Sequence, residues 1–378
     1  MADRKKIVLI GPVYPYKGGI AHYTGLMYRA LSAHYEVTLI SYKMQYPKLL
    51  FHKAQKDYSS DVFRIEDTQY LINTVDAAGC IRNGHRIRKM KPDLVIIQWW
   101  HPYFAPCYRL LTAGIGSEIP VLFVCHNVFP HERFPMDRKL TRMALKRGRY
   151  FIVHSGSDGE DLMQIQADAC YRYNPHPTYN AFRMQGMSME EARLRLGIGQ
   201  EENVLLFFGF VREYKGLKVL LKAMVRICTD VERVRLIIAG SFGDDREVYR
   251  NLIMEYDLED RIILADDYIP DNEVEKYFAA CNLVTVPYLS ATQSGIIQIA
   301  YGFEKPVLAT TVGGLPDVVY EGETGILVPP DDPGALADGA VRYFRDHLEA
   351  QMAEGIRRHT QEFSWEHMVM SIHELTGV

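Results

Sequence analysis

Short apolar runs recur along the whole chain, and each is followed by a longer stretch of helical character. In the first half these runs are Lys6–Ile10, Glu36–Ser41, Leu94–Gln98, Val121–Cys125 and Tyr150–His154. In the second half they are Val204–Phe208, Arg235–Ala239, Arg261–Leu264, Leu283–Val286 and Val307–Thr310. Strands that are apolar throughout are typical of parallel sheets with helices on both faces. The sequence therefore predicts an α/β protein with two doubly wound parallel sheets.

The 378 residues are enough for two domains, each with its own core. The segment 171–188 is rich in proline, asparagine and tyrosine and has no clear period, so we place the domain boundary near residue 180. The expected domains are 1–180 and 181–360. Ligands of such sheets bind beyond the carboxyl ends of the strands, and a cleft between the domains is the expected site.

Composition indicates a globular protein, with 48% hydrophobic and 24% charged residues. The sequence contains no apolar stretch of about 18 residues, and its start, MADRKKIVLIGP, does not resemble a secretory signal. We therefore expect a cytoplasmic protein. The six cysteines are scattered and form no C-x-x-C pair, so we expect reduced core thiols and no metal site.

Charge is distributed unevenly between the halves. Residues 1–180 carry 24 lysines and arginines against 15 acidic residues, whereas residues 181–378 carry 19 against 32. Two basic clusters contribute to this excess: Arg82, Arg86, Arg88, Lys89 and Lys91, and then Arg133, Arg138, Lys139, Arg142, Lys146, Arg147 and Arg149. Either cluster alone is typical of a solvated helix face. Together they favour an anionic acceptor or peripheral contact with the inner face of a membrane, and nothing indicates nucleic acid.

Three loops that follow predicted strands have residues suited to anions. Gly18 and Gly19 precede a predicted helix and allow close approach of a ligand to the backbone, although a glycine pair is also common in simple turns. Arg212 and Lys215 follow a strand and precede a helix, where two cations suit a diphosphate. Ser294 is a cap-type residue at a third helix start.

Taken in order, these motifs resemble the retaining glycosyltransferases of family 4, also called group 1. The resemblance rests on the Gly-Gly loop, VCHN, the loop ending in KG, KPVLAT, GGLPDVV and GETGILVPPDDP, and it is more specific in the second half. It implies the GT-B fold, with two Rossmann-like domains facing a cleft and a final helix, within 361–378, that crosses back to the first domain. It also implies transfer of a sugar from a nucleotide-diphosphate-sugar to a saccharide or lipid-linked acceptor, as in polysaccharide biosynthesis.

The resemblance also implies roles for individual residues. Gly18 and Gly19 would face the donor phosphates, Arg212 and Lys215 would stabilise the leaving diphosphate, and His126 would lie beside the transferred sugar. The remaining donor contacts would come from Ser294, Gly295 and Ile296 at a helix start and from Tyr268 and Ile269 beside the base. No metal or cofactor is required, because the nucleotide-sugar, with UDP or GDP as the expected nucleotide, is a co-substrate. His131 and Glu132 are expected to form a solvated turn.

Two departures from the family pattern leave alternatives open. Phe210 stands where the family has an arginine, so we assign that role to Arg212. Ala291 and Ile299 stand where the family has two glutamates, with Gln293 and Gln298 nearby. A non-catalytic nucleotide-sugar-binding protein of the same fold is therefore one alternative. Others are another GT-B enzyme, such as a sugar-nucleotide epimerase or a phosphorylase, and an unrelated α/β nucleotide-binding protein.

Overall fold

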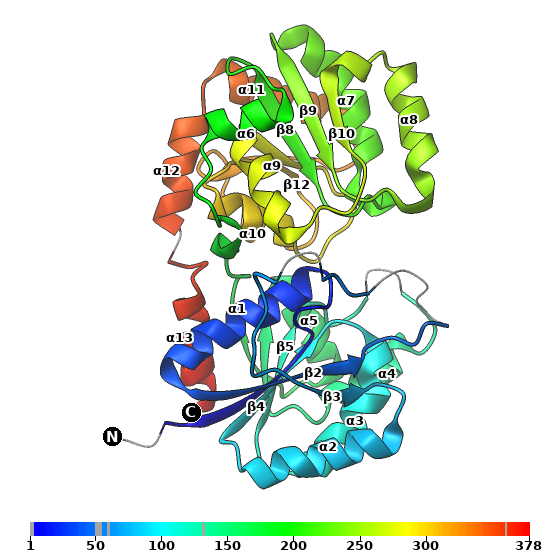
Figure 1. Ribbon diagram of the computed structural model, residues 1–378, viewed down its shortest axis with the longest axis vertical. Coiled ribbons are helices and arrows are strands. Elements are labelled where there is room, and N and C mark those ends of the chain that lie inside the picture. Colours follow the sequence, from blue (N-terminus) through cyan, green and yellow to red (C-terminus); the bar gives the residue numbers. More distant parts are fainter. Residues whose placement is uncertain (1–3, 50–54, 59–60, 131–132, 360) are drawn as a thin grey trace. The chain divides into compact units, whose positions relative to one another are not determined.

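The structure is a computed structural model, and it describes residues 4–49, 55–58, 61–130, 133–359 and 361–378. The chain divides into two compact units. The first unit comprises Met1–Pro175 and Ser364–Val378, and the second comprises His176–Phe363. Each unit has a parallel sheet with helices packed around it (Figure 1). The predicted fold class, with two doubly wound Rossmann-like sheets, is confirmed.

Within the described residues, the sheet of the first unit has seven strands in the order β3-β2-β1-β4-β5-β6-β7, and all neighbours are parallel. The strands are β1 (Lys6–Ile10), β2 (Glu36–Met44), β3 (Gln69–Asn73), β4 (Leu94–Trp99), β5 (Val121–Cys125), β6 (Tyr150–Val153) and β7 (Cys170–Tyr173). Ile10 pairs with both Ile40 and Ile97, so the central strands end at a common edge. The loops after β1 and β5 leave the sheet there.

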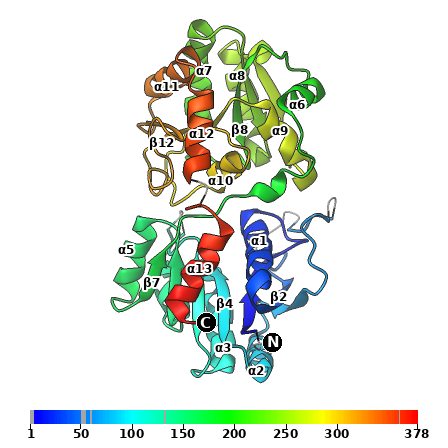
Figure 2. The same cartoon turned by 90° about the vertical axis from the view of Figure 1, so that its left-hand side faces the viewer.

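Five of the helices described in the first unit form two groups, and Figure 2 shows α1 beside α13. One group packs α1 against α13, and the other packs α2, α3 and α4 together. The helices are α1 (Gly19–His34), α2 (Ala77–Met90), α3 (Ala105–Ile115), α4 (Asp137–Leu145), α5 (Gly156–Ile165) and α13 (Trp365–Thr376). No helix in the described ranges is long and apolar enough to cross a membrane.

Helix α13 belongs to the first unit although the whole second unit precedes it in the sequence. The indole of Trp365 packs edge-on against the Tyr23 ring of α1, with 5.0 Å between centroids. Ser371 donates a hydrogen bond of 2.9 Å from its hydroxyl to the side-chain oxygen of Asn174, and Glu374 forms an ion pair with Arg172. These contacts attach α13 to both α1 and the segment around β7.

The second unit contains, among the described residues, a parallel sheet in the order β10-β9-β8-β11-β12-β13. The strands are β8 (Asn203–Phe208), β9 (Val234–Ala239), β10 (Ile262–Ala265), β11 (Leu283–Val286), β12 (Val307–Thr310) and β13 (Gly325–Val328). The helices are α6 (Met189–Leu196), α7 (Leu217–Asp230), α8 (Arg246–Glu255), α9 (Val274–Ala280), α10 (Gly295–Gly302), α11 (Pro333–Arg345) and α12 (Glu349–His359). Leu205, Leu236 and Leu283 contribute to its buried core.

Two strands of the first sheet were not predicted, and both lie at its edges. β3 and β7 alternate or are largely exposed instead of being apolar throughout, because an edge strand is not covered as a central strand is. The cysteine prediction also needs correction. Cys80, Cys107, Cys125 and Cys281 are buried, but Cys170 is exposed on β7 and Cys228 is partly buried.

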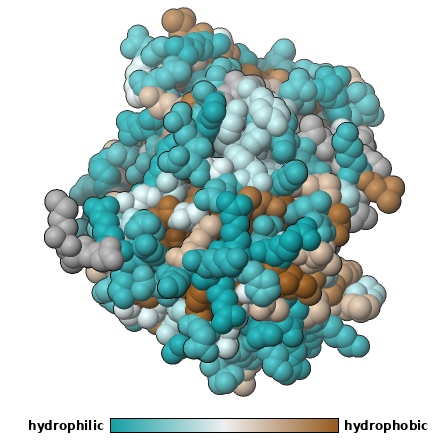
Figure 3. Space-filling model, turned by 60° about the horizontal axis from the view of Figure 1, so that its bottom comes forward, coloured by the Kyte–Doolittle hydropathy of each residue, from teal (hydrophilic) through white to brown (hydrophobic). Residues whose placement is uncertain are grey.

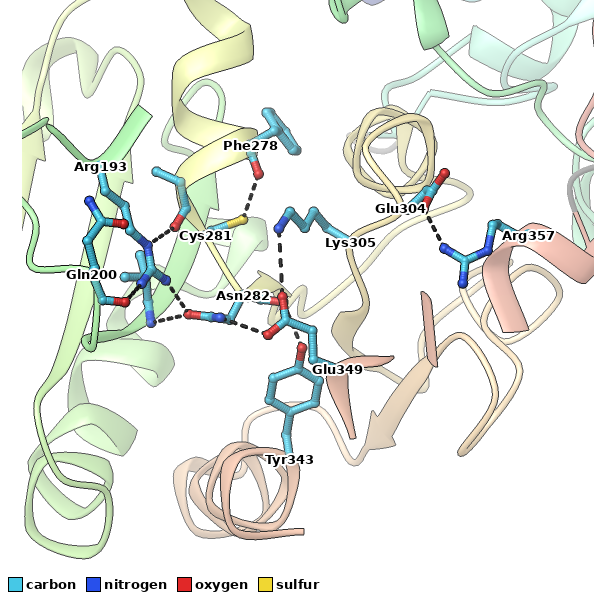
Figure 4. Close-up of polar contacts among 12 residues, drawn as sticks. Arg193, Gln200, Phe278, Cys281, Asn282, Glu304, Lys305, Tyr343, Glu349 and Arg357 are labelled. Carbon is cyan, nitrogen blue, oxygen red and sulfur yellow. Dashed lines mark hydrogen bonds and ion pairs between the residues drawn. The ribbon is translucent and has the colours of Figure 1, made fainter. Parts of the chain in front are cut away.

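A polar network ties several elements of the second unit together at the amino end of β11 (Figure 4). The side-chain oxygen of Asn282 accepts hydrogen bonds from Arg193 of α6 at 2.8 Å and from the Val204 amide of β8 at 2.9 Å. Its side-chain nitrogen donates to Glu349 of α12 at 2.8 Å, and its carbonyl accepts from the Tyr343 hydroxyl of α11 at 2.8 Å. This network fixes the edge of the sheet opposite to the strand ends where ligands are expected.

Candidate functional site

The loops after β8, β9 and β10 continue the pairing of their strands. The amide of Gly209 donates to the Ala239 carbonyl, that of Val211 to the Ser241 carbonyl and that of Gly240 to the Ala265 carbonyl, each at 2.9 Å. Gly240 has a φ of +146°, and a Cβ there would lie 2.0 Å from the Gly209 carbonyl oxygen. Only glycine fits this approach of two backbones. The carboxyl edge of the second sheet is therefore an ordered surface.

Lys215 lies at this edge with its side chain buried. It ends a 3-10 turn, Glu213–Lys215, directly before α7. Its ammonium Nζ lies 3.0 Å from the position that a Cβ on Gly209 would occupy and 5.6 Å from the centroid of the Tyr288 ring. No carboxylate of a described residue forms an ion pair with it. A buried cation without a carboxylate partner is well placed to bind an anion.

The environment of Lys215 disfavours its charged form. Burial is the main cause that lowers its pKa; Tyr214 opposes the shift, and the positive charge of Arg212 adds to it. Arg212 itself is exposed, and its carbonyl accepts a hydrogen bond of 3.0 Å from the Lys215 amide. The two predicted cations are thus neighbours, one buried and one on the surface. A bound anion would favour the charged form of Lys215.

The start of α10 lies beside the same strand end. Ile296 is within 3.5 Å of the Cβ position on Gly209, and the buried hydroxyl of Ser294 lies 3.5 Å from that of Tyr288. Ser294 is the N-cap residue of α10, but its side chain makes no capping hydrogen bond, contrary to its expected local role. Among the described residues, a Cβ on Gly295 would approach Tyr179 alone, at 3.8 Å. The structure therefore brings Lys215, Ser294 and Ile296 together.

The GGLP turn supports this helix start from the other side. Gly313 has a φ of +50°, and a Cβ there would lie 1.5 Å from the carbonyl oxygen of Ala291. The Gly314 amide donates to the Thr292 carbonyl at 3.0 Å. The motif found in the sequence thus holds the loop that leads into α10.

Ala291 and Ile299, at the positions of the two missing glutamates, are buried apolar residues. Gln298 is also buried, and its side-chain amide makes no hydrogen bond to any residue that the structure describes. Its carbonyl accepts a hydrogen bond from the Tyr179 amide at 3.2 Å. The described residues thus provide no carboxylate at either of these two positions.

Tyr268 and Ile269 line a pocket at the carboxyl end of β10. Its volume is about 350 Å³, within the range of small-ligand pockets. Asp266, on the same wall, forms ion pairs with Arg246 at 2.7 Å and with Arg250 at 3.0 Å. These pairs join the pocket wall to α8.

His126 follows β5 of the first unit and is 3% exposed. Its amide donates to the Trp99 carbonyl at 2.8 Å, which continues the pairing of β5 with β4. Its ring Nε2 lies 2.8 Å from the side-chain oxygen of Gln98. Because that oxygen can only accept, Nε2 carries the hydrogen and donates it. The ring also packs edge-on against Tyr23, with 4.5 Å between centroids.

Two further residues near His126 were not singled out in the sequence. Asp158, on α5, accepts hydrogen bonds from the Val128 amide at 2.8 Å and from the Ser155 hydroxyl at 2.7 Å, and so holds the loop that begins with His126. Burial raises the pKa of Asp158 to about 6, although both hydrogen bonds oppose the shift. Burial also lowers the pKa of His154 to about 4. Because α5 and β6 lie far from His126 in the sequence, only the fold connects these residues with it.

Gly18 and Gly19 lie at the start of α1, whereas the sequence placed both of them before the helix. Gly18 has a φ of +104° and occupies the N-cap position. A Cβ on either glycine would meet no atom of the described residues within 4 Å. Open space therefore lies beside the backbone where close approach of a ligand was expected. His131 and Glu132 lie outside the described residues.

Comparison with known proteins places both halves in related families. Residues 17–172 match the family described as glycosyltransferase family 4, and residues 202–346 match glycosyl transferases group 1. A D-inositol 3-phosphate glycosyltransferase of Corynebacterium glutamicum is 34% identical over 182 residues, which cover 47% of this chain and 43% of that protein. One from Corynebacterium jeikeium is 29% identical over 255 residues, covering 64% and 61%. The match thus spans about half the length of these relatives.

Solved structures share the fold over nearly the whole chain. Sucrose-phosphate synthase from Thermosynechococcus elongatus superposes with a TM-score of 0.73 at 20% identity and covers 98% of both chains. HepE from Anabaena, in complex with UDP, gives a TM-score of 0.73 at 17% identity and covers 99% of this chain and 100% of that one.

Proposed function

We propose that this chain, which belongs to the family 4, group 1 glycosyltransferases, transfers a sugar from a nucleotide-diphosphate-sugar to a saccharide or lipid-linked acceptor with retention of configuration. The observation that carries this proposal is the buried ammonium of Lys215, which has no carboxylate partner among the described residues. It lies beside Ile296, at the start of α10. A cation and a helix start at one point form an environment suited to a diphosphate.

In the proposed reaction, the bond between the anomeric carbon and the diphosphate oxygen breaks while an acceptor hydroxyl attacks from the same face. The hydroxyl proton passes to the departing phosphate oxygen. Negative charge grows on the diphosphate, and Lys215, Arg212 and the amides of Ser294, Gly295 and Ile296 stabilise it. Such fixed charges and dipoles cost no reorganisation at the moment of reaction.

The first unit is proposed to contribute His126, Gly18 and Gly19. The hydrogen bond to Gln98 fixes the tautomer of His126, and we propose that the imidazole lies beside the transferred sugar. The open backbone at Gly18 and Gly19 is proposed to approach the donor phosphates. No titration of His126 is required for this role.

We propose that Tyr268 and Ile269 contact the nucleobase in the pocket after β10. UDP and GDP are the nucleotides that we would test first. The choice of UDP is supported by solved structures of HepE, which shares the fold, in complex with UDP and with UDP-glucose. Nucleotide release with UDP-, GDP- and ADP-sugars would identify the donor.

The experiment that tests the reaction is product analysis by proton NMR after incubation with each donor and candidate acceptors. An anomeric signal of the same configuration as the donor supports retention, and inversion would refute it. The buried apolar residues at positions 291 and 299 favour one alternative, a nucleotide-sugar-binding protein without transferase activity. Binding of a donor without transfer or hydrolysis would support that alternative.

The basic clusters support a further proposal, peripheral contact of the first unit with an anionic membrane. Their members on and around α2 and α4 are exposed, and Arg82 and Arg133 form ion pairs. Figure 3, which brings the lower part of Figure 1 and with it α2 forward, shows that hydrophilic residues cover much of that face. Co-sedimentation with anionic and neutral vesicles at low salt tests this proposal. Equal binding to both, or to neither, would contradict it.

A further inference from the structure

Phe210 is an exposed aromatic residue at the carboxyl edge of the second sheet. Its side chain is 46% exposed, and it is the one exposed phenylalanine among the residues that the structure describes. It stands directly after the strand-end Gly209. Neither the diphosphate contacts nor the pocket residues proposed above assign it a role.

The backbone holds Phe210 in a fixed place. Its two neighbours, Gly209 and Val211, each donate a hydrogen bond of 2.9 Å, one to the last residue of β9 and the other to the segment that follows it. Phe210 is therefore part of an ordered ladder and not the tip of a free loop. An exposed ring that is held in place by the backbone gains no hydrophobic stabilisation in the free protein. It gains that stabilisation when a ligand covers the ring and removes its surface from water.

The Phe210 ring lies close to the pocket after β10. Its centroid is 6.3 Å from that of Tyr268, and the two ring planes differ by 29°. Tyr268 in turn lines the pocket of about 350 Å³. The Phe210 ring thus lies beside a pocket-lining ring and nearly parallel to it, next to the residues that line the pocket. Flat heterocycles stack on such rings, and every nucleobase has the required π face.

We infer that Phe210 binds the nucleobase of the donor by stacking, together with Tyr268, and so contributes affinity for the base and not for the phosphates. This inference rests on the proposed function, because it assumes a nucleotide donor. It gives a role to the residue that replaces an arginine of the family pattern. The charge of that arginine is then supplied by Arg212 and Lys215, two and five positions further along the chain.

The test compares ligands with and without a base. Dissociation constants of UDP, GDP and inorganic pyrophosphate are measured by calorimetry for the wild type and for Phe210→Ala, Phe210→Trp and Lys215→Met. Phe210→Ala should weaken the binding of the nucleotide that the wild type prefers by roughly five- to 150-fold, as for one lost base–aromatic stack, and leave pyrophosphate unchanged. Phe210→Trp should retain nucleotide affinity. Lys215→Met should weaken both kinds of ligand.

Val248→Ala is the matched control, because Val248 is a similarly exposed apolar residue on α8. The affinity of this variant for nucleotides should equal that of the wild type. Circular dichroism melts of all variants establish that they are folded. If the wild type binds UDP or GDP and folded Phe210→Ala binds it equally well, the inference is wrong and the proposed function stands. Equal weakening of nucleotide and pyrophosphate also overturns it. If the folded wild type binds none of the nucleotides, the proposed function fails as well.

Discussion

Lys215 is a buried cation whose charge opposes folding and, on our proposal, serves donor binding. Replacing it with methionine keeps much of its length and removes the charge. We expect Lys215→Met to weaken the binding of a nucleoside diphosphate by roughly 1.5 to 3 kcal/mol, as for a lost charged hydrogen bond. The same change should leave the free energy of unfolding unchanged or raise it, because a desolvated ammonium is no longer buried. Calorimetry and urea denaturation measure the two effects.

Lys218→Met is the control for this prediction. Lys218 is the second residue of α7, is exposed, and forms an ion pair of 3.2 Å with Glu213. Its replacement should change neither quantity by more than about 0.5 kcal/mol. A fall in stability of Lys215→Met together with unchanged affinity would show that Lys215 is structural.

Asp158 and His154 give stability opposite dependences on pH in the same range. Because the pKa of Asp158 is raised to about 6, its favourable contribution to the free energy of unfolding is complete below about pH 4. This contribution is lost as the pH rises through 6. The lowered pKa of His154, about 4, means that its contribution is present above about pH 6.5 and is lost as pH falls through 4. The two effects oppose each other in the wild type between about pH 4 and 6.5.

In Asp158→Asn, the pH dependence of stability that comes from His154 should therefore no longer be opposed by that of Asp158. Asparagine can still accept a hydrogen bond from Val128 but does not titrate. Relative to the wild type, this variant should gain roughly 1 to 3 kcal/mol of stability between pH 4 and pH 7. Urea denaturation at several pH values measures the difference. Parallel curves for the two proteins would contradict the assigned pKa of Asp158.

Among the elements, β11 depends on the network around Asn282. Asn282→Ala removes the acceptor of the Arg193 and Val204 donors and should cost roughly 2 to 4 kcal/mol, because both donors belong to buried residues. Asn203→Ala is the matched control. Asn203 makes an exposed hydrogen bond of 2.9 Å to the Glu232 carbonyl, and its loss should cost less than about 1 kcal/mol. If urea denaturation shows that both variants lose the same free energy of unfolding, the network around Asn282 stabilises the protein no more than one exposed hydrogen bond does.

The central elements could be predicted from the sequence because burial on both faces leaves a continuous apolar run, as in β4 and β5. The edge strands β3 and β7 could not, since no such run marks them. The loops with glycines and cations were likewise visible as local patterns. Gln98, Asp158 and the network around Asn282 were not, because their partners lie far away along the chain and only the fold brings them together.

At the scale of the whole molecule, the first unit depends for part of its stability on the packing of α13, which follows the second unit in the sequence. Ile372 is buried on this helix, whereas Met370, two residues earlier, is 58% exposed. Ile372→Ala should destabilise the first unit by roughly 2 to 4 kcal/mol, and Met370→Ala should change its stability by less than about 0.5 kcal/mol. Hydrogen exchange, followed separately for amides of the two units, measures where protection is lost. Loss confined to the second unit would contradict the attachment of α13 to α1.

The return of α13 to the first unit also sets an order of events during protein synthesis. The ribosome releases the seven described strands of the first sheet early, but the helix that packs on α1 appears only after the entire second unit has been made. Until then the Tyr23 ring of α1 lacks its contact with Trp365, and incomplete packing of this kind is what chaperones protect. Residues that are translated after the whole second unit are thus needed to complete the packing of the first unit.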